Sequence, residues 1–157
     1  MTEPAPNRAS APSPNYAPYA LATGSAAVRR LRALHEVYSP FARGVLTAAG
    51  LKAGMHVADF GCGVGMTTRM LAEMVGPSGF VTGVDFSAAQ LKEAREISVR
   101  DGIHNVTFQE ADACATALPR ASFDLAYCRF LLLHLPNPQA CLNEMLAVLK
   151  PGRHFGH

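Results

Sequence analysis

The order of four short apolar segments constrains the fold of this chain more than any other sequence feature. The segments cover residues 56–60, 80–85, 106–110 and 123–128. Between the first three, apolar residues recur every three or four positions, which is the spacing of one helix face. Asn137 and Pro138 open a further predicted helix. Strands and helices that alternate with short connections predict an α/β fold, with a doubly wound, mostly parallel sheet and helices on both faces.

The first 50 residues divide into a proline-rich stretch and a helical stretch. Five of the 11 prolines fall within residues 1–18, a composition typical of a disordered tail. From Ser25 onward the apolar residues take helical spacing. The pair Ser39 and Pro40 predicts that one helix stops there and that a second begins, with Ser39 as its N-cap, and runs to Gly50.

Charge, hydropathy and cysteine usage exclude several classes of protein. A formal net charge of +2 argues against a concentrated basic surface, so we expect no nucleic-acid partner. No apolar run approaches the roughly 20 residues that span a bilayer, and the N-terminus lacks the pattern of a secretory signal. The four cysteines lie far apart and form no C-x-x-C pair. We therefore expect no metal site, no membrane span and a reducing, cytoplasmic location.

Aspartates stand at the carboxyl ends of the first three predicted strands. Asp59 lies late in the first strand, Asp85 ends the second and Asp112 follows the third. A carboxylate inside an apolar run is costly unless it is hydrogen-bonded. Ligands of open parallel sheets bind outside the carboxyl ends of the strands. The three aspartates in register therefore favour one polar ligand at this edge.

A glycine-rich loop follows the first predicted strand and opens a helix. Its glycines, Gly61, Gly63 and Gly65, permit a tight turn and a close approach of a ligand to the backbone. The dinucleotide fingerprint G-x-G-x-x-G places its third glycine three positions after the second, whereas Gly65 comes two positions after Gly63. Asp85 lies 20 residues beyond Gly65, where a carboxylate can accept from both hydroxyls of a ribose.

Five motifs in order resemble those of class I S-adenosylmethionine-dependent methyltransferases, in particular the small-molecule branch that includes enzymes of ubiquinone and menaquinone biosynthesis. The motifs lie at residues 59–65, 83–87, 110–113, 123–125 and 149–152, and the resemblance covers residues 19–152. It implies a Rossmann-like fold, S-adenosyl-L-methionine as cofactor and methyl transfer to a small-molecule acceptor. It also implies a helical lid over residues 19–50, with Tyr16 and Tyr19 as candidate lid residues, before a cofactor-binding domain over 51–157.

The resemblance also implies roles for individual residues near the methionine part of the cofactor. Asp59 and the glycine loop would hold this part. The residues of the loop that would do so are Gly61, Cys62, Gly63 and Gly65. Arg129 would lie near the reactive end of the cofactor. His134 is a candidate base on the acceptor side, and a simple loop histidine is the alternative reading.

The nucleoside part of the cofactor has its own implied contacts. Asp85 would bind the ribose hydroxyls, and Gln90 is a second candidate on the ribose side. Phe86 would pack on the adenine. Asp112 would accept from the adenine amino group, with the backbone of Ala113 beside it.

The similar enzymes continue after the turn at 149–152 with a fifth strand, a helix and an antiparallel pair of strands. This chain ends at His157, so we expect those strands to be missing and the domain to be incomplete. We expect the edge of the strand at 123–128, and the apolar side chains at 130–135, to be uncovered and to permit self-association. Two alternatives stay open: a non-catalytic cofactor-binding fragment that needs a partner, and a nicotinamide-dependent oxidoreductase.

Overall fold

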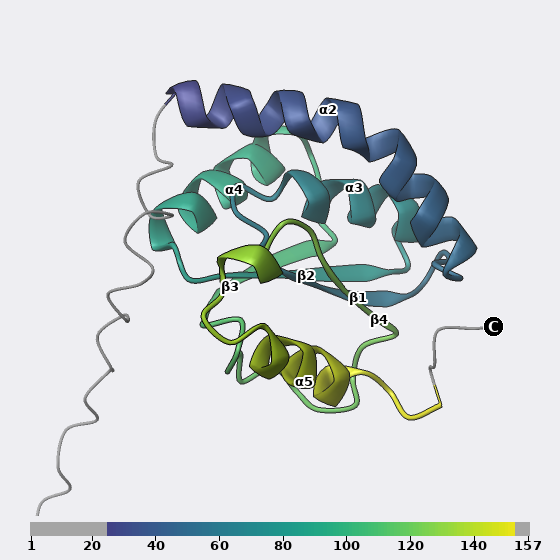
Figure 1. The fold of residues 1–157 in the computed structure, drawn as a ribbon. Coiled ribbons are helices and arrows are strands. Elements are labelled where there is room, and N and C mark those ends of the chain that lie inside the picture. The colour runs from purple at the N-terminus through teal and green to yellow at the C-terminus, as the bar shows by residue number, and fades with distance from the viewer. Residues whose placement is uncertain (1–24, 153–157) are drawn as a thin grey trace, which may run out of the picture.

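The computed structural model describes residues 25–152 of the chain (Figure 1). The predicted tail over residues 1–18 and the candidate lid residues Tyr16 and Tyr19 lie outside the described residues. The strands are β1 (His56–Phe60), β2 (Phe80–Asp85), β3 (Val106–Glu110) and β4 (Leu125–Cys128). The helices are α2 (Ser25–Ala48), α3 (Met66–Val75), α4 (Ala88–Arg100), the 3-10 helix η2 (Leu132–His134) and α5 (Pro138–Val148).

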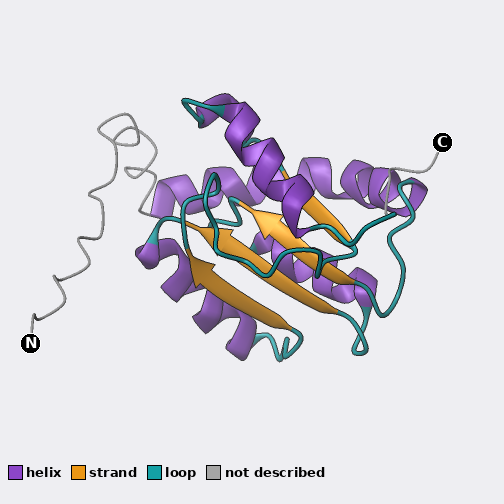
Figure 2. Ribbon diagram, turned by 90° about the horizontal axis from the view of Figure 1, so that it is seen from below, coloured by secondary structure: helices purple, strands orange, loops and turns teal. Residues whose placement is uncertain are grey.

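The four strands form one parallel sheet in the order β3-β2-β1-β4. Figure 2 shows them side by side with their arrowheads at one edge. Figure 1 shows α2, α3 and α4 on one face of the sheet and α5 on the other. The predicted α/β fold with helices on both faces is therefore confirmed. The strand order reverses between β1 and β4, and this pair forms the switch point where open parallel sheets bind ligands.

Apolar side chains fill the core on both faces of the sheet. Toward α2 and α3, the fully buried side chains of Val57 and Val81 pack against Leu71 and Val75. Toward α5, a second buried cluster contains Ala58, Phe60, Val84, Phe123, Cys141 and Val148. Alternate residues of β1 thus face opposite layers, as expected for a strand covered on both sides.

The predicted break at Ser39 and Pro40 is wrong, because α2 is one helix of 24 residues with Pro40 inside it. Figure 1 shows this helix as a continuous ribbon that bends along its length. The hydroxyl of Ser39 is buried and has no hydrogen-bond partner among the described residues, so it caps nothing. A proline inside a helix removes one backbone hydrogen bond and costs about 3 kcal/mol. Burial of Ala42 and Leu46 against the core offsets this cost.

The apolar run after β4 is largely covered. Phe130 has a positive φ of 59°, and the chain then turns into η2. Leu131, Leu132 and Leu135 pack on the core beside α5, whereas Phe130 and Leu133 stay exposed. The expectation that the whole run is uncovered is therefore wrong for these three leucines. Within residues 25–152, the strand β4 itself pairs only with β1.

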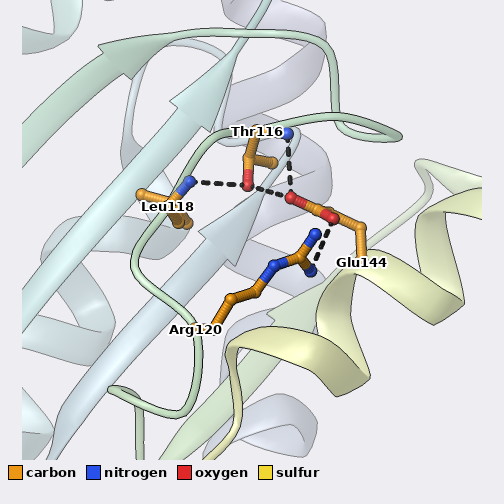
Figure 3. A network of polar contacts seen from close by, with 4 residues as sticks. All are labelled: Thr116, Leu118, Arg120 and Glu144. Carbon is orange, nitrogen blue, oxygen red and sulfur yellow. Dashed lines mark hydrogen bonds and ion pairs between the residues drawn. The ribbon is translucent and has the colours of Figure 1, made fainter.

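A buried carboxylate ties the loop between β3 and β4 to α5 (Figure 3). Glu144 accepts hydrogen bonds at Oε1 from the backbone N–H of Thr116, at 3.0 Å, and from its hydroxyl, at 2.7 Å. Its Oε2 accepts from Arg120 Nη1 at 2.9 Å. Burial alone would raise the pKa of Glu144, but the bonds from Thr116 and the charge of Arg120 outweigh it and lower the pKa.

Replacing Glu144 with alanine should lower the free energy of unfolding by about 1–3 kcal/mol, because the donors of Thr116 lose their acceptor in a buried position. Since the folded pKa of Glu144 lies below the unfolded value, its stabilisation is present above the unfolded value of 4.5 and is lost as the pH falls below it. Urea unfolding at pH 7 measures the effect. Glu96→Ala, on the exposed face of α4, is the control and should change stability by less than about 0.5 kcal/mol.

Candidate cofactor site

The glycine loop forms a tight turn between β1 and α3. Gly61, Gly63 and Gly65 all have positive φ, at 71°, 55° and 74°, which is a conformation that glycine adopts without strain. The backbone N–H groups of Gly61 and Cys62 donate to the carbonyl of Val84 and so fasten the loop to the end of β2. The loop therefore lies against the carboxyl end of the sheet, beside the switch point.

A small cavity of about 80 Å³ lies over this loop. Its lining consists of Gly61, Cys62, Gly63, Val64, Met66, Thr67, Gln90, Arg129 and Phe130. A Cβ atom on Gly63 would lie 2.8 Å from Gln90 Oε1, and one on Gly61 would lie 2.9 Å from Leu131 Cδ1. Because Gln90 lines the cavity and Leu131 does not, the open space depends on the missing side chain of Gly63, whereas Gly61 permits close packing of Leu131. Three sequence-predicted elements meet here: the glycine loop, Gln90 and Arg129.

Asp59 is buried near the end of β1, with 2% of its surface exposed. Its Oδ2 accepts a hydrogen bond from Thr68 Oγ1 at 2.7 Å. Burial raises the pKa of Asp59 from 3.8 to about 7, although the Thr68 bond and the charge of Arg129 oppose this rise. A carboxylate held in this way gains from a cationic ligand group, because such a group favours its ionised form.

Asp85 holds the glycine loop as well as the start of α4. Its Oδ2 accepts from the Gly63 N–H and its Oδ1 from the Ser87 N–H, both at 2.9 Å. Burial raises its pKa despite these bonds. Ser87 in turn caps α4 by accepting from the Gln90 N–H. The Phe86 backbone N–H is a third donor to the Asp85 carboxylate, which leaves part of its accepting capacity for a ligand hydroxyl.

Arg129 joins the loop after β4 to α2. Its Nη2 lies 3.0 Å from Nδ1 of His35, whereas its Nη1 is buried and has no hydrogen-bond partner among the described residues. An unpaired buried guanidinium nitrogen is costly, and such a group in a native structure points to a missing partner. Because Arg129 also lines the cavity, an anionic or polar group bound at the glycine loop would satisfy this nitrogen.

The three aspartates do not lie in one register. Asp59 is paired across the sheet with Gly83, and Asp85 with Glu110, so Asp85 lies two residues further toward the edge. Asp112 is exposed and accepts from the backbone N–H of Cys114, 2.8 Å away. The expectation of three aspartates in register is therefore wrong, and Asp112 caps its own turn.

Phe86, Ala113 and His134 are predicted site residues that do not line the cavity. Phe86 and Ala113 are half-buried, and His134 is exposed on η2. Cys62 contributes its backbone to the loop, since its thiol packs in a cluster with Leu91, Ala94 and Phe108. Burial raises the pKa of this thiol well above its ordinary value.

Sequence reasoning missed two residues that contact the predicted site residues. The first is His35, whose ring contacts Arg129, a residue 94 positions later in the chain. No local pattern indicates such a pair. Thr68 supports Asp59 from α3, and its only signal is its place in the first turn after the loop.

Within residues 25–152, no three potential metal ligands lie close together, and no helix combines the length and the apolar character that a membrane span needs. A parallel sheet with a glycine loop and a cavity at its switch point is characteristic of α/β proteins that bind nucleotide-like cofactors.

Comparison with known proteins identifies the family. A methyltransferase domain family matches residues 51–156. The demethylmenaquinone methyltransferase of Listeria monocytogenes serotype 4a (strain HCC23) is 40% identical over 99 residues, which make up 63% of this chain and 42% of that protein. The ubiquinone/menaquinone biosynthesis C-methyltransferase UbiE of Pseudomonas paraeruginosa (strain DSM 24068 / PA7) is 33% identical over 120 residues, 76% of this chain and 46% of that protein. This chain belongs to the methyltransferase domain family.

A solved structure agrees with this assignment. The crystal structure of a SAM dependent methyltransferase from Aquifex aeolicus matches with a TM-score of 0.65 and 32% identity, over 69% of this chain and 58% of that one. The resemblance inferred from the motifs is therefore confirmed, and S-adenosylmethionine is the cofactor of the family. The nicotinamide-dependent alternative has no support. The chain spans less than half the length of the two curated relatives.

Proposed function

We propose that this chain binds S-adenosylmethionine at the carboxyl edge of the sheet, with the amino-acid end of the cofactor in the cavity over the glycine loop, and transfers its methyl group to a small-molecule acceptor. The observation that carries the proposal is the buried nitrogen of Arg129 at this cavity, which is unpaired among the described residues and near enough to the buried Asp59 to act on its pKa. The amino-acid end of the cofactor carries a carboxylate and an ammonium group, so it complements both side chains.

The other contacts follow from the same placement. The Gly61–Gly65 backbone would lie against the methionine part, because a side chain at Gly63 would enter the cavity beside Gln90. Asp85 and Gln90, which are both buried, would bind the ribose. Phe86, Asp112 and Ala113 would flank the adenine just beyond the ends of β2 and β3.

Methyl transfer asks little acid–base chemistry of these residues. The sulfonium of the bound cofactor activates the methyl group, and the chain contributes by holding donor and acceptor in line. His134, as candidate base, stands outside the cavity lining, so its part in the reaction would require approach of an acceptor from η2.

An apolar acceptor fits the rim of the cavity. Phe130 lines the cavity and packs edge-on against Tyr38 of α2, with the ring centroids 5.4 Å apart. The relatives named above act in quinone biosynthesis according to their names, and an aromatic rim suits a planar apolar substrate. We therefore propose that the methyl acceptor is an apolar ring compound.

The remaining expectations on partners and location form part of the proposal. The outer edge of β4 offers backbone groups for a further strand, whether from additional sequence or from a second copy. The described cysteines, Cys62, Cys114, Cys128 and Cys141, are all free thiols, which supports a reducing compartment. The small net charge supports the absence of a nucleic-acid partner.

Thermal unfolding with and without ligand tests the cofactor assignment. A ligand at 100 times its Kd stabilises the folded state by about 2.7 kcal/mol, so S-adenosylhomocysteine should raise the Tm by several degrees. The same concentration of NAD should leave the Tm unchanged. A shift with NAD alone would contradict the proposal and favour an oxidoreductase.

A further inference from the structure

We propose that His35 is a positioning residue, which holds the guanidinium of Arg129 so that its free nitrogen binds the carboxylate of S-adenosylmethionine. This inference rests on the proposed function and goes beyond it. It assigns a role at the cofactor site to the helix α2, which precedes the residues matched to the methyltransferase domain.

The contact between His35 and Arg129 fixes the protonation state of the histidine ring. Arginine has only donors, so Nδ1 of His35 must accept the hydrogen bond from Arg129 Nη2, at 3.0 Å. The imidazole is therefore neutral, with its proton on Nε2. This bond occupies one end of the guanidinium fork and leaves Nη1, which is buried, for a second acceptor. A carboxylate is the acceptor that a guanidinium binds most strongly.

The surroundings of His35 favour the neutral ring. Burial lowers its pKa, and the charges of Arg129, Arg69 and Arg43 lower it further, against a smaller opposite effect of Glu36. A groove next to His35 separates α2 from α3. Its charged residues are Arg32, Glu36 and Arg43 of α2, Arg69 and Glu73 of α3, and Asp101 at the end of α4. A protonated His35 would repel Arg129, so the neutral form is the one that can position it.

The attachment of α2 does not depend on His35. Ala42 and Leu46 bury the helix against the core, and Arg43 forms an ion pair with Glu73 of α3. Loss of the imidazole therefore removes the bond to Arg129 while the helix stays packed. This separation makes the positioning role testable by substitution.

Calorimetric binding of two ligands to the full 157-residue chain provides the test. S-adenosylmethionine and decarboxylated S-adenosylmethionine differ only in the carboxylate. His35→Ala should weaken binding of the first at least tenfold and change binding of the second less than twofold. His35→Asn, which places an amide oxygen near the position of Nδ1, should restore most of the affinity. His104→Ala removes an exposed histidine and serves as the control.

A double-mutant cycle with Arg129→Ala completes the test. Once Arg129 is absent, removal of His35 should have no further effect on S-adenosylmethionine binding. Equal losses for both ligands, no loss at all, or fully additive losses would overturn the positioning role. Failure of the parent chain to bind either ligand would instead refute the proposed function, so the two failures are distinguishable.

Discussion

Gly63→Val should weaken the binding of S-adenosylhomocysteine more than a hundredfold while the chain still folds. Gly63 has a φ of 55°, and a Cβ there would lie 2.8 Å from Gln90 Oε1. A β-branched side chain would both resist this backbone conformation and occupy the cavity. Circular dichroism measures the fold, and calorimetry at pH 8 measures the binding. We expect a loss of about 1–3 kcal/mol in stability from backbone strain.

Gly102→Val separates the strain from the blocked cavity. Gly102 also has a positive φ, 68°, but no atom lies within 4 Å of the place where its Cβ would stand. This control should lose similar stability and bind the ligand within twofold of the parent. Normal binding by Gly63→Val would mean that the loop is only a structural turn.

Asp59→Asn should stabilise the fold at pH 8 and weaken cofactor binding. A gain in stability together with a loss of affinity is typical of a residue in a functional site. The pKa of Asp59 rises from 3.8 to about 7 on folding, so the ionised carboxylate costs the folded state about 4 kcal/mol at pH 8. Asparagine removes this cost and keeps an oxygen for the Thr68 hydroxyl, which lies 2.7 Å from Asp59 Oδ2. Burial of the asparagine amide costs about 1–2 kcal/mol, so the free energy of unfolding should rise by about 2–3 kcal/mol.

The pH dependence of stability checks the sign. The pKa of Asp59 is higher in the folded state than in the unfolded state. The contribution of this carboxyl to the free energy of unfolding is therefore fully present below pH 3.8 and is lost as the pH rises through 7. The advantage of Asp59→Asn should therefore shrink as the pH falls toward 4.

Loss of a charge-assisted bond to the ligand ammonium should weaken S-adenosylhomocysteine binding by about 10- to 100-fold. Asp101→Asn, on the surface, should change neither property. A destabilised Asp59→Asn that binds normally would contradict the assignment.

The strands and most helices are predictable from the sequence, since their signals are local. The bounds of β1, β2 and β3 agree with the predicted segments, and Asn137 caps α5 through the N–H of Ala140 as its position suggests. The predicted helix break at Pro40 was wrong because the sequence shows only the local cost of a proline inside a helix. The burial of Ala42 and Leu46 that offsets this cost arises only in the folded chain. The 3-10 helix η2 was missed because it too depends on packing in the folded chain, where Leu132 lies against the core.

The candidate site is predictable only in part. Asp59, Asp85 and the glycine loop follow from their places at strand ends, and the structure brings Gln90 and Arg129 to the same cavity. The stagger of Asp59 and Asp85 could not be predicted, because the offset between neighbouring strands depends on how they pair in the folded sheet. His35 shows another limit, because only the folded chain reveals that α2 passes beside the loop after β4.

Calorimetric titration of the 157-residue chain with S-adenosylhomocysteine tests the central claim most directly. The chain should bind one molecule per copy, S-adenosylmethionine should compete for the same site, and Arg129→Ala should weaken the binding by at least tenfold, because the buried guanidinium is the proposed carboxylate partner. A folded chain that binds neither ligand at millimolar concentration, or binds them equally well without Arg129, would contradict the account.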